Sequence, residues 1–178
     1  MSRTAVDTES SWFSDDEMAA LRRKLPILYV DIVPVRLDAF GAISEVGLML
    51  RADGSGRIVR SIVSGRVLVH EALREAVIRH VEKDLGPVAL PKVPASLTPF
   101  TVAEYFPTPG QSLFVDPRQH AVSLAYIIPM EGDCAPQSDA LELSWFPAED
   151  MASSPVMDEM DDSHSVIVRR ALMTGGLL

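Results

Sequence analysis

One stretch, from Gly65 to Gly86, constrains the fold of this chain more than any other. Its apolar residues recur at four-residue steps, which predicts an amphipathic helix over residues 68–85 with one buried face. The residues of this apolar stripe are Leu73, Val77, Val81 and Leu85. Gly86 suits the C-terminal cap of the helix, and Pro87 prevents the helix from continuing. The chain therefore has one well-specified helix, and the rest of the fold must be arranged around it.

Segments rich in β-branched and aromatic residues lie on both sides of this helix and are typical of strands. Residues 27–40, 43–51 and 57–64 precede it, and a turn at 53–56 joins the last two into a hairpin. Residues 100–106, 120–129 and 141–146 follow it. Pro34, in the first segment, indicates an edge strand or a bulge. Strands on both sides of a central helix predict an α/β (α+β) sandwich.

Further helices are expected near both ends of the chain. Ser14 to Glu17 has the pattern of a capping box, and it opens a helix that Pro26 closes. A short helical turn is expected at 147–151, and Asp162 or Ser163 is expected to cap a last helix. We therefore expect an N-terminal extension and helix over residues 1–26, followed by one domain over residues 27–178.

The stretch from Gly65 to Gly86 resembles the Nudix box, G-x5-E-x7-R-E-U-x-E-E-x-G-U, in which U is a bulky aliphatic residue. The matching positions are Gly65, Glu71, Arg79, Val81 and Gly86. The positions of the three carboxylates that follow the arginine in the family hold His80, Lys83 and Asp84. The resemblance implies a Nudix-like α/β/α sandwich with a mixed central sheet, in which the box forms a loop, a helix and a second loop.

Two further segments carry the same resemblance. LELSWFPAEDM, from position 141, resembles the late strand and short helix of Nudix proteins. FVDPRQHAVSLAY, from position 114, resembles a segment of ADP-ribose-type Nudix enzymes and of Nudix-related regulators. Both occur in the order of the family, so the resemblance covers residues 28–150. The whole chain is similar to an uncharacterised actinobacterial Nudix-like group.

The box implies chemistry on a nucleoside diphosphate linked to another group. Nudix hydrolases use Mg²⁺ or Mn²⁺, which neutralises the pyrophosphate and activates water, and the box carboxylates bind that ion. Positions 80, 83 and 84 share one helix face, but only Asp84 keeps a carboxylate. Lys83 places an ammonium group there, and like unit charges about 4 Å apart repel by about 4 kcal/mol at an effective dielectric of 20. These replacements predict weak or lost catalysis.

The resemblance assigns the catalytic positions to Asp84, Glu71 and Arg79, of which the last two fix the box loop against the helix in the family. Asp84 and His80 are the candidate metal ligands. An imidazole is a softer ligand than a carboxylate and suits transition metals better than Mg²⁺. The alternative for His80 is a histidine on the surface of the helix.

Three residues are candidates for binding the ligand itself. Lys83 can bind a phosphate directly, and Arg118 can donate two parallel hydrogen bonds to one. Asp116 belongs to the same D-P-R segment as Arg118. The alternative for this segment is a capped turn before a strand, with Asp116 and Pro117 supplying the turn chemistry.

Three functions therefore stay open at the level of sequence. The first is binding of a nucleoside-diphosphate-type small molecule with weak or lost hydrolysis. The second is an active hydrolase of ADP-ribose or nucleotide-sugar type, with a metal site formed by Asp84, His80 and an acid from residues 131–139. The third is an interaction protein that uses the acidic C-terminal face at residues 131–162.

Composition limits the class of partner. The net charge of −9 disfavours nucleic acid or an anionic membrane as a partner. No apolar run reaches the ~18–20 residues of a transmembrane helix. The N-terminus lacks the apolar core of a signal peptide, so a cytoplasmic location is expected. Cys134 is the only cysteine, which excludes an intrachain disulfide. Homodimers are common among Nudix proteins, and a homodimer is kept open here.

Overall fold

The computed structural model describes residues 13–137, 139–151 and 155–176. Its first half contains the elements α1 (Asp15–Arg22), β1 (Ile27–Leu37), β2 (Ile43–Ala52), β3 (Ile58–Ser61), β4 (Val63–Arg66) and α2 (Leu73–Leu85). Its second half contains β5 (Thr101–Phe106), β6 (Phe114–Val115), β7 (Ala121–Pro129), β8 (Glu142–Pro147), α3 (Ala148–Met151), the 3₁₀-helix η1 (Pro155–Glu159) and α4 (Asp162–Thr174).

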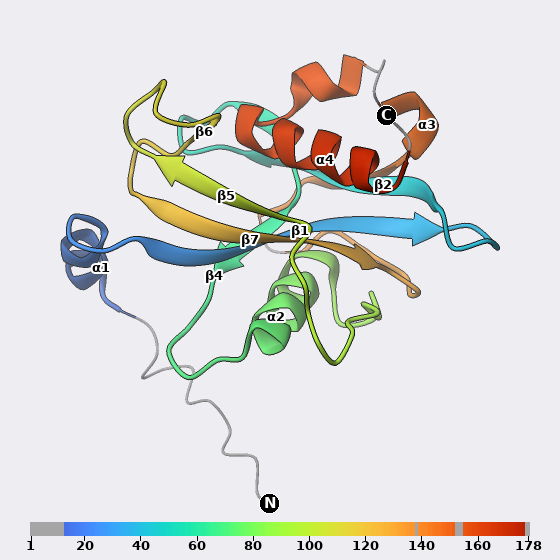
Figure 1. The fold of residues 1–178 in the computed structure, drawn as a ribbon, viewed down its shortest axis with the longest axis horizontal. Coiled ribbons are helices and arrows are strands. Elements are labelled where there is room, and N and C mark those ends of the chain that lie inside the picture. Colours follow the sequence, from blue (N-terminus) through green and yellow to red (C-terminus); the bar gives the residue numbers. More distant parts are fainter. Residues whose placement is uncertain (1–12, 138, 152–154, 177–178) are drawn as a thin grey trace, which may run out of the picture.

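A mixed sheet lies between helices, as Figure 1 shows, with α2 on one face and α4 on the other. The strand order is β3-β2-β1-β7-β5-β6, with β4 paired to β1 and β8 paired to β2. β1 and β7 run parallel along their length, and β5 and β6 are also parallel. The α/β/α sandwich with a mixed sheet, predicted from the sequence, is therefore confirmed.

β1 changes its partner half-way along one side. Residues 29–32 pair with β4, and residues 35–37 pair with β2, so the sheet splits between these two partners. Pro34 lies between the two paired segments, where its missing N–H interrupts neither ladder. The expectation that Pro34 marks an edge strand is wrong, because β7 pairs with β1 throughout on the other side. A register irregularity does occur nearby, between Arg36 and Leu37.

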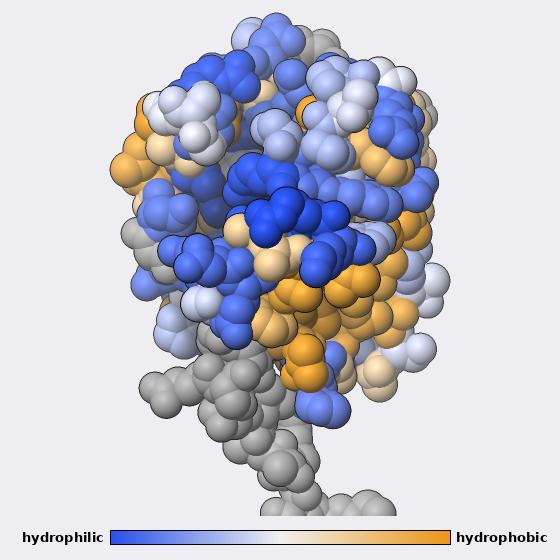
Figure 2. Space-filling model, turned by 90° about the vertical axis from the view of Figure 1, so that its left-hand side faces the viewer, coloured by the Kyte–Doolittle hydropathy of each residue, from blue (hydrophilic) through white to orange (hydrophobic). Residues whose placement is uncertain are grey.

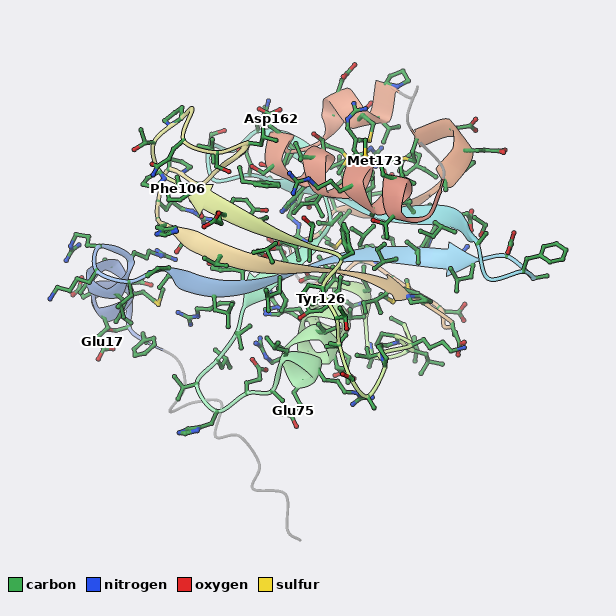
Figure 3. All side chains as sticks on the ribbon, in the orientation of Figure 1. Glu17, Glu75, Phe106, Tyr126, Asp162 and Met173 are labelled. Carbon is green, nitrogen blue, oxygen red and sulfur yellow. The ribbon has the colours of Figure 1, made fainter. Side chains whose placement is uncertain are left out.

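Two hydrophobic clusters hold the layers together. Alternate residues of β1 point to opposite faces of the sheet, as the period of a strand requires. Val33 and Val35 belong to the cluster beneath α4, whereas Val30 and Ile32 belong to the cluster beneath α2. Figure 3 shows Tyr126, from β7, between the sheet and α2. The valine-rich composition of β1 is explained by this burial on both faces.

Two predicted element boundaries differ from the structure. The box helix was expected from residue 68, but α2 begins at Leu73, because Glu71 uses its carboxylate to hold the preceding residues in a loop. The strand expected at 57–64 is broken into β3 and β4 on either side of Ile62, since the first part pairs with β2 and the second with β1. The last helix is capped by Asp161, which directly precedes the two expected caps, Asp162 and Ser163.

The side of the molecule that carries α1 has a mixed surface. Figure 2 shows hydrophilic residues over its upper part and a continuous apolar area lower down and to one side. Apolar areas of this kind are candidate contact surfaces. The homodimer stays a prediction. No helix in the described part of the chain is long and apolar enough to cross a membrane.

Candidate functional site

The loop before α2 is fixed by a partly buried ion pair. Arg79 donates from Nε to Glu71 Oε1 at 2.6 Å and from Nη2 to Glu71 Oε2 at 2.8 Å. Arg79 also donates to the Arg66 carbonyl at 2.9 Å, and the Leu68 amide donates to Glu71 at 2.9 Å. Burial raises the pKa of the Glu71 carboxyl, but the hydrogen bonds from Arg79 and Leu68 outweigh it, so the net pKa is lowered. Glu71 and Arg79 therefore support the loop, and a catalytic role for them stays a prediction.

His80 is buried, with only 4% of its surface exposed, so the alternative of a surface histidine is wrong. Its Nε2 lies 3.0 Å from the Arg66 carbonyl oxygen, which requires Nε2 to carry the proton and to donate. Its Nδ1 is buried and has no hydrogen-bond partner among the described residues. Burial lowers the pKa of the imidazole, with Arg79 contributing, despite the hydrogen bond to Arg66. His80 therefore packs as a neutral side chain against β4.

The packing of His80 explains why Gly65 must be glycine. A Cβ added at Gly65 would lie 1.8 Å from His80 Cε1, which no side chain tolerates. We expect Gly65→Ala to destabilise the fold by about 2–3 kcal/mol through overpacking. For a chain of this size that is a fall in melting temperature of roughly 4–12 °C, measurable by thermal denaturation. Gly54→Ala is the control, because nothing lies within 4 Å of its added Cβ, and equal melting of the two variants would contradict the packing argument.

Burial of the neutral imidazole also predicts a dependence of stability on pH. Because the pKa of His80 is lowered in the folded state, the unfolded chain binds more protons below the ordinary histidine pKa of 6.5. Stability should therefore fall as the pH drops below about 6.5, by up to about 1.4 kcal/mol for each unit of pKa shift. Urea denaturation between pH 7.5 and 5 should show a shallower fall for His80→Gln than for the wild type.

The control for this pH prediction is His70→Asn. His70 is exposed and has a backbone φ of 62°, which asparagine tolerates. This variant should retain the pH dependence of the wild type. A His80→Gln variant that loses as much stability with acid as the wild type would show that other groups carry the effect.

Asp84 is the last carboxylate of the box, and it is 99% buried between two cations. Arg51 Nη2 lies 3.1 Å from its Oδ2, and Lys83 Nζ lies 3.5 Å from its Oδ1. Lys83 is half exposed, so its ammonium approaches Asp84 from the surface of the helix. A divalent ion on Asp84 would be repelled by both cations. Two like unit charges about 4 Å apart repel by about 4 kcal/mol at an effective dielectric of 20, and the repulsion is greater for a divalent ion. The donor set at positions 80, 83 and 84 therefore does not fit a Mg²⁺ or Mn²⁺ site.

No group of three His, Cys, Asp or Glu side chains that could hold a metal ion occurs within residues 13–137, 139–151 and 155–176. His80 and Asp84 are one helical turn apart, and Asp84 Oδ1, like His80 Nδ1, lacks a hydrogen bond from any described residue. Two atoms fall short of the ligand set that a metal requires. The predicted acid from residues 131–139 is not brought to this pair in the described chain.

A cleft of about 640 Å³ opens where β1 changes partner. Its walls come from β1, the β2–β3 hairpin, β4, β5, the D-P-R segment and the start of α4. In the cleft, Asp31 accepts hydrogen bonds from Ser64 Oγ at 2.6 Å and from the Tyr105 hydroxyl at 2.9 Å. Burial and the neighbouring Asp31 raise the pKa of Tyr105 well above its ordinary value, so Tyr105 keeps its proton and donates. The cleft thus has a polar wall whose side chains are hydrogen-bonded to one another.

The D-P-R segment also lines the cleft, next to the strand that carries Tyr105. Arg118 donates from Nε to Asp116 Oδ1 at 2.8 Å and from Nη2 to Oδ2 at 3.0 Å, and its amide also donates to Oδ1. Gln119, itself buried, donates to Asp116 at 2.9 Å. Burial raises the pKa of Asp116, but the hydrogen bonds from Arg118 and Gln119 bring it below its ordinary value. The alternative of a capped turn thus accounts for the contacts of this segment, although Arg118 still lines the cleft.

The predicted site residues form two separate groups. Glu71, Arg79 and His80 lie around the box loop, whereas Asp116 and Arg118 line the cleft. Arg51 connects the groups, because it lines the cleft and also pairs with Asp84. Sequence reasoning missed Arg51, Asp31 and Tyr105. Asp31 had a recognisable signal, an acid in the middle of an apolar strand, whereas the partner of Arg51 is 33 residues away.

The acids of the predicted acidic face, residues 131–162, are partly used inside the molecule. Glu142 and Glu159 both pair with Arg60, at 3.5 and 2.8 Å. Asp161 accepts from the amides of residues 163 and 164 as the cap of α4. These contacts give several of the carboxylates structural roles. A protein partner for this face stays a prediction.

A family model described as a domain of unknown function (DUF4916) matches residues 8–177 of the chain. A solved structure from Jonesia denitrificans DSM 20603, named as a possible asymmetric diadenosine tetraphosphate (Ap4A) hydrolase, is 54% identical, with a TM-score of 0.83 over 87% of this chain and 98% of the other. The chain belongs to the DUF4916 family, and its fold is that of the Nudix proteins.

More distant Nudix structures share the fold alone. The Nudix domain of Shewanella oneidensis NrtR, complexed with ADP-ribose, is 18% identical, with a TM-score of 0.62 over 91% of this chain and 99% of that one. A bifunctional NMN adenylyltransferase/ADP-ribose pyrophosphatase from Francisella tularensis, complexed with AMP and a Mn ion, is 13% identical, with a TM-score of 0.60 over 91% of this chain and 48% of that one. No curated protein matches the sequence.

Proposed function

We propose that this Nudix protein binds a nucleoside-diphosphate-linked ligand in the cleft and hydrolyses it weakly or not at all. The observation that carries the proposal is the enclosure of Asp84 by Arg51 and Lys83. Of the three box positions 80, 83 and 84, only Asp84 has a carboxylate that could hold a metal, and this enclosure occupies it. The cleft beside it stays open, with a volume of about 640 Å³. A cleft of that size suits a nucleotide-sized ligand. The names of the neighbours, which include Ap4A and ADP-ribose, point to the same ligand class.

The first experiment separates binding from turnover. Thermal-shift titrations with ADP-ribose and with Ap4A, with and without Mg²⁺ or Mn²⁺, should show stabilisation by at least one of the two compounds. A ligand at about 100 times its dissociation constant adds about 2.7 kcal/mol, which is roughly 5–11 °C for a chain of this size. Chromatography of the same mixtures should show little or no product. Metal-dependent turnover that Asp84→Ala abolishes would overturn the proposal.

The second candidate is an active hydrolase with an altered metal site. It is favoured by the name of the 54% identical structure and by the two unsatisfied buried atoms, His80 Nδ1 and Asp84 Oδ1. It requires Arg51 and Lys83 to withdraw from Asp84 when a metal binds. Elemental analysis of the purified protein should then find a transition metal, and His80→Gln should release it. Hydrolysis of Ap4A by protein that contains no such metal would count against this candidate. So would a lack of hydrolysis with every metal that is added.

A further inference from the structure

Two polar side chains on the β2–β3 hairpin line the cleft with donors that have no acceptor. Arg51 Nε and Ser61 Oγ are buried and make no hydrogen bond to any residue that the structure describes. Ser61 as a whole is 96% buried. A buried donor without an acceptor is unfavourable, and natural proteins keep few of them. Because both side chains line the cleft, a ligand bound there can supply their acceptor.

The register of the hairpin places the two side chains next to each other. Arg51 is paired with Val59, and Met49 is paired with Ser61, in an antiparallel ladder. Paired residues share a face and side chains alternate along each strand, so Arg51 and Ser61 are diagonal neighbours on one face. At that spacing an arginine and a hydroxyl can both reach a single phosphoryl group. A serine hydroxyl also turns readily between staggered rotamers, so it can follow the ligand.

Asp84 fixes the arginine in this arrangement. Arg51 Nη2 is held at 3.1 Å from Asp84 Oδ2 and at 3.1 Å from Met49 Sδ, so one nitrogen of the guanidinium is anchored in the protein. The side chain keeps 17% of its surface exposed, and it lines the cleft. An arginine that is anchored at one nitrogen loses little freedom when a second group binds to the remaining donors.

We infer that Arg51 and Ser61 form an anion subsite in the cleft that takes a phosphoryl group of the ligand, and that Asp84 holds Arg51 in place for it. Asp84 acts here through the protein rather than through a metal ion. The inference rests on the proposed function, since it names the residues that bind the diphosphate. The recognition chemistry is that of charge-assisted hydrogen bonds from guanidinium N–H groups, together with one from a hydroxyl, to phosphoryl oxygens.

Two acids at this end of the cleft are compatible with an anion. Asp53 accepts hydrogen bonds from Ser55 and from the amide and side chain of Arg57, which together lower its pKa to about 2 and satisfy its charge within the turn. Asp139 is exposed, so water and salt screen its charge. Neither carboxylate is directed at Arg51 by any hydrogen bond in the described chain.

The test is isothermal titration calorimetry with inorganic pyrophosphate in the presence of a chelator. The wild type should bind, because the subsite needs no metal. Arg51→Lys keeps a cation for Asp84 but loses the guanidinium donors, and it should raise the dissociation constant about tenfold. Ser61→Ala should raise it roughly fivefold. Thermal melting of each variant checks that the fold is kept.

The matched control is Ser123→Ala. Ser123 also has a buried hydroxyl without a partner among the described residues, but it does not line the cleft. Its loss should change the dissociation constant by less than about twofold, since it makes no contact with the ligand. Equal affinities for the Ser61 and Ser123 variants, or no pyrophosphate binding by the wild type, would overturn the subsite. Binding of ADP-ribose without pyrophosphate would remove the subsite and leave the proposed function intact.

Discussion

Replacing Arg79 by methionine is expected to lower the free energy of unfolding by about 3 kcal/mol, because it leaves a buried carboxylate without its cation. Only 5% of the Glu71 side chain is exposed, and both of its oxygens accept from Arg79. The Arg66 carbonyl loses a donor in the same variant. The fall in melting temperature should be roughly 6–12 °C for a chain of this size. Urea denaturation at pH 7 measures the change directly.

The same prediction has a control on the same helix and a rescue. Arg74 lies on α2 as well, but it is exposed and makes one long hydrogen bond, 3.4 Å from Nη2 to the Val93 carbonyl. Arg74→Met should therefore change stability by less than about 0.5 kcal/mol. Adding Glu71→Gln to Arg79→Met should recover part of the loss, since an amide costs less to bury than an unpaired carboxylate. If the Arg79 and Arg74 variants have the same melting temperature, the ion pair does not hold the box loop.

The framework of the box could be predicted from the sequence because its determinants are local. The apolar stripe of α2 and the cap at Gly86 follow from the helical repeat and from glycine's tolerance of positive φ, here 90°. The contact of Glu71 with Arg79 follows from the resemblance to the Nudix box. The start of α2 at Leu73 could not be predicted, because the loop before this helix depends on the side-chain contacts of Glu71 rather than on helix propensity.

The cleft could be predicted only in part, because long-range pairing creates it. The D-P-R segment was recognised, and its turn contacts lie within four residues, from Asp116 to Gln119. By contrast, the break at Ile62 exists because the residues before it pair with β2 and the residues after it pair with β1. A pattern of β-branched residues along the chain does not show which strand each part pairs with. The polar wall around Asp31 is formed by this break together with β5, so it could not be derived from spacing.

The predicted metal position illustrates the same limit in chemical terms. Helical spacing correctly places His80 and Asp84 on one side of α2, and it correctly places an ammonium group beside Asp84. It does not show that Arg51 approaches from β2 and completes the enclosure of Asp84. Position on a helix gives a residue's neighbours on that helix, whereas the charge around a carboxylate depends on every element that packs against it. Asp84 is thus the partner of an arginine in this structure, and its role as a metal ligand stays a prediction.

Arg51→Met should be the most destabilising change in the cleft, because it removes the closer cation from a carboxylate that is 99% buried. The expected loss is about 3–4 kcal/mol, or roughly 6–16 °C in melting temperature. The double variant Arg51→Met/Asp84→Leu should recover most of it, since apolar side chains of similar volume often replace a buried ion pair without loss. Arg57→Met, which breaks an ion pair on a side chain that is 64% exposed, is the control and should cost less than about 1 kcal/mol.

A divalent metal bound to Asp84 would give a different result. The single variant would then be rescued by Mg²⁺ or Mn²⁺, and the double variant would lose that rescue. Thermal melting of the wild type and the three variants, with chelator and with each metal, therefore decides whether Asp84 is the partner of Arg51 or a ligand of an ion.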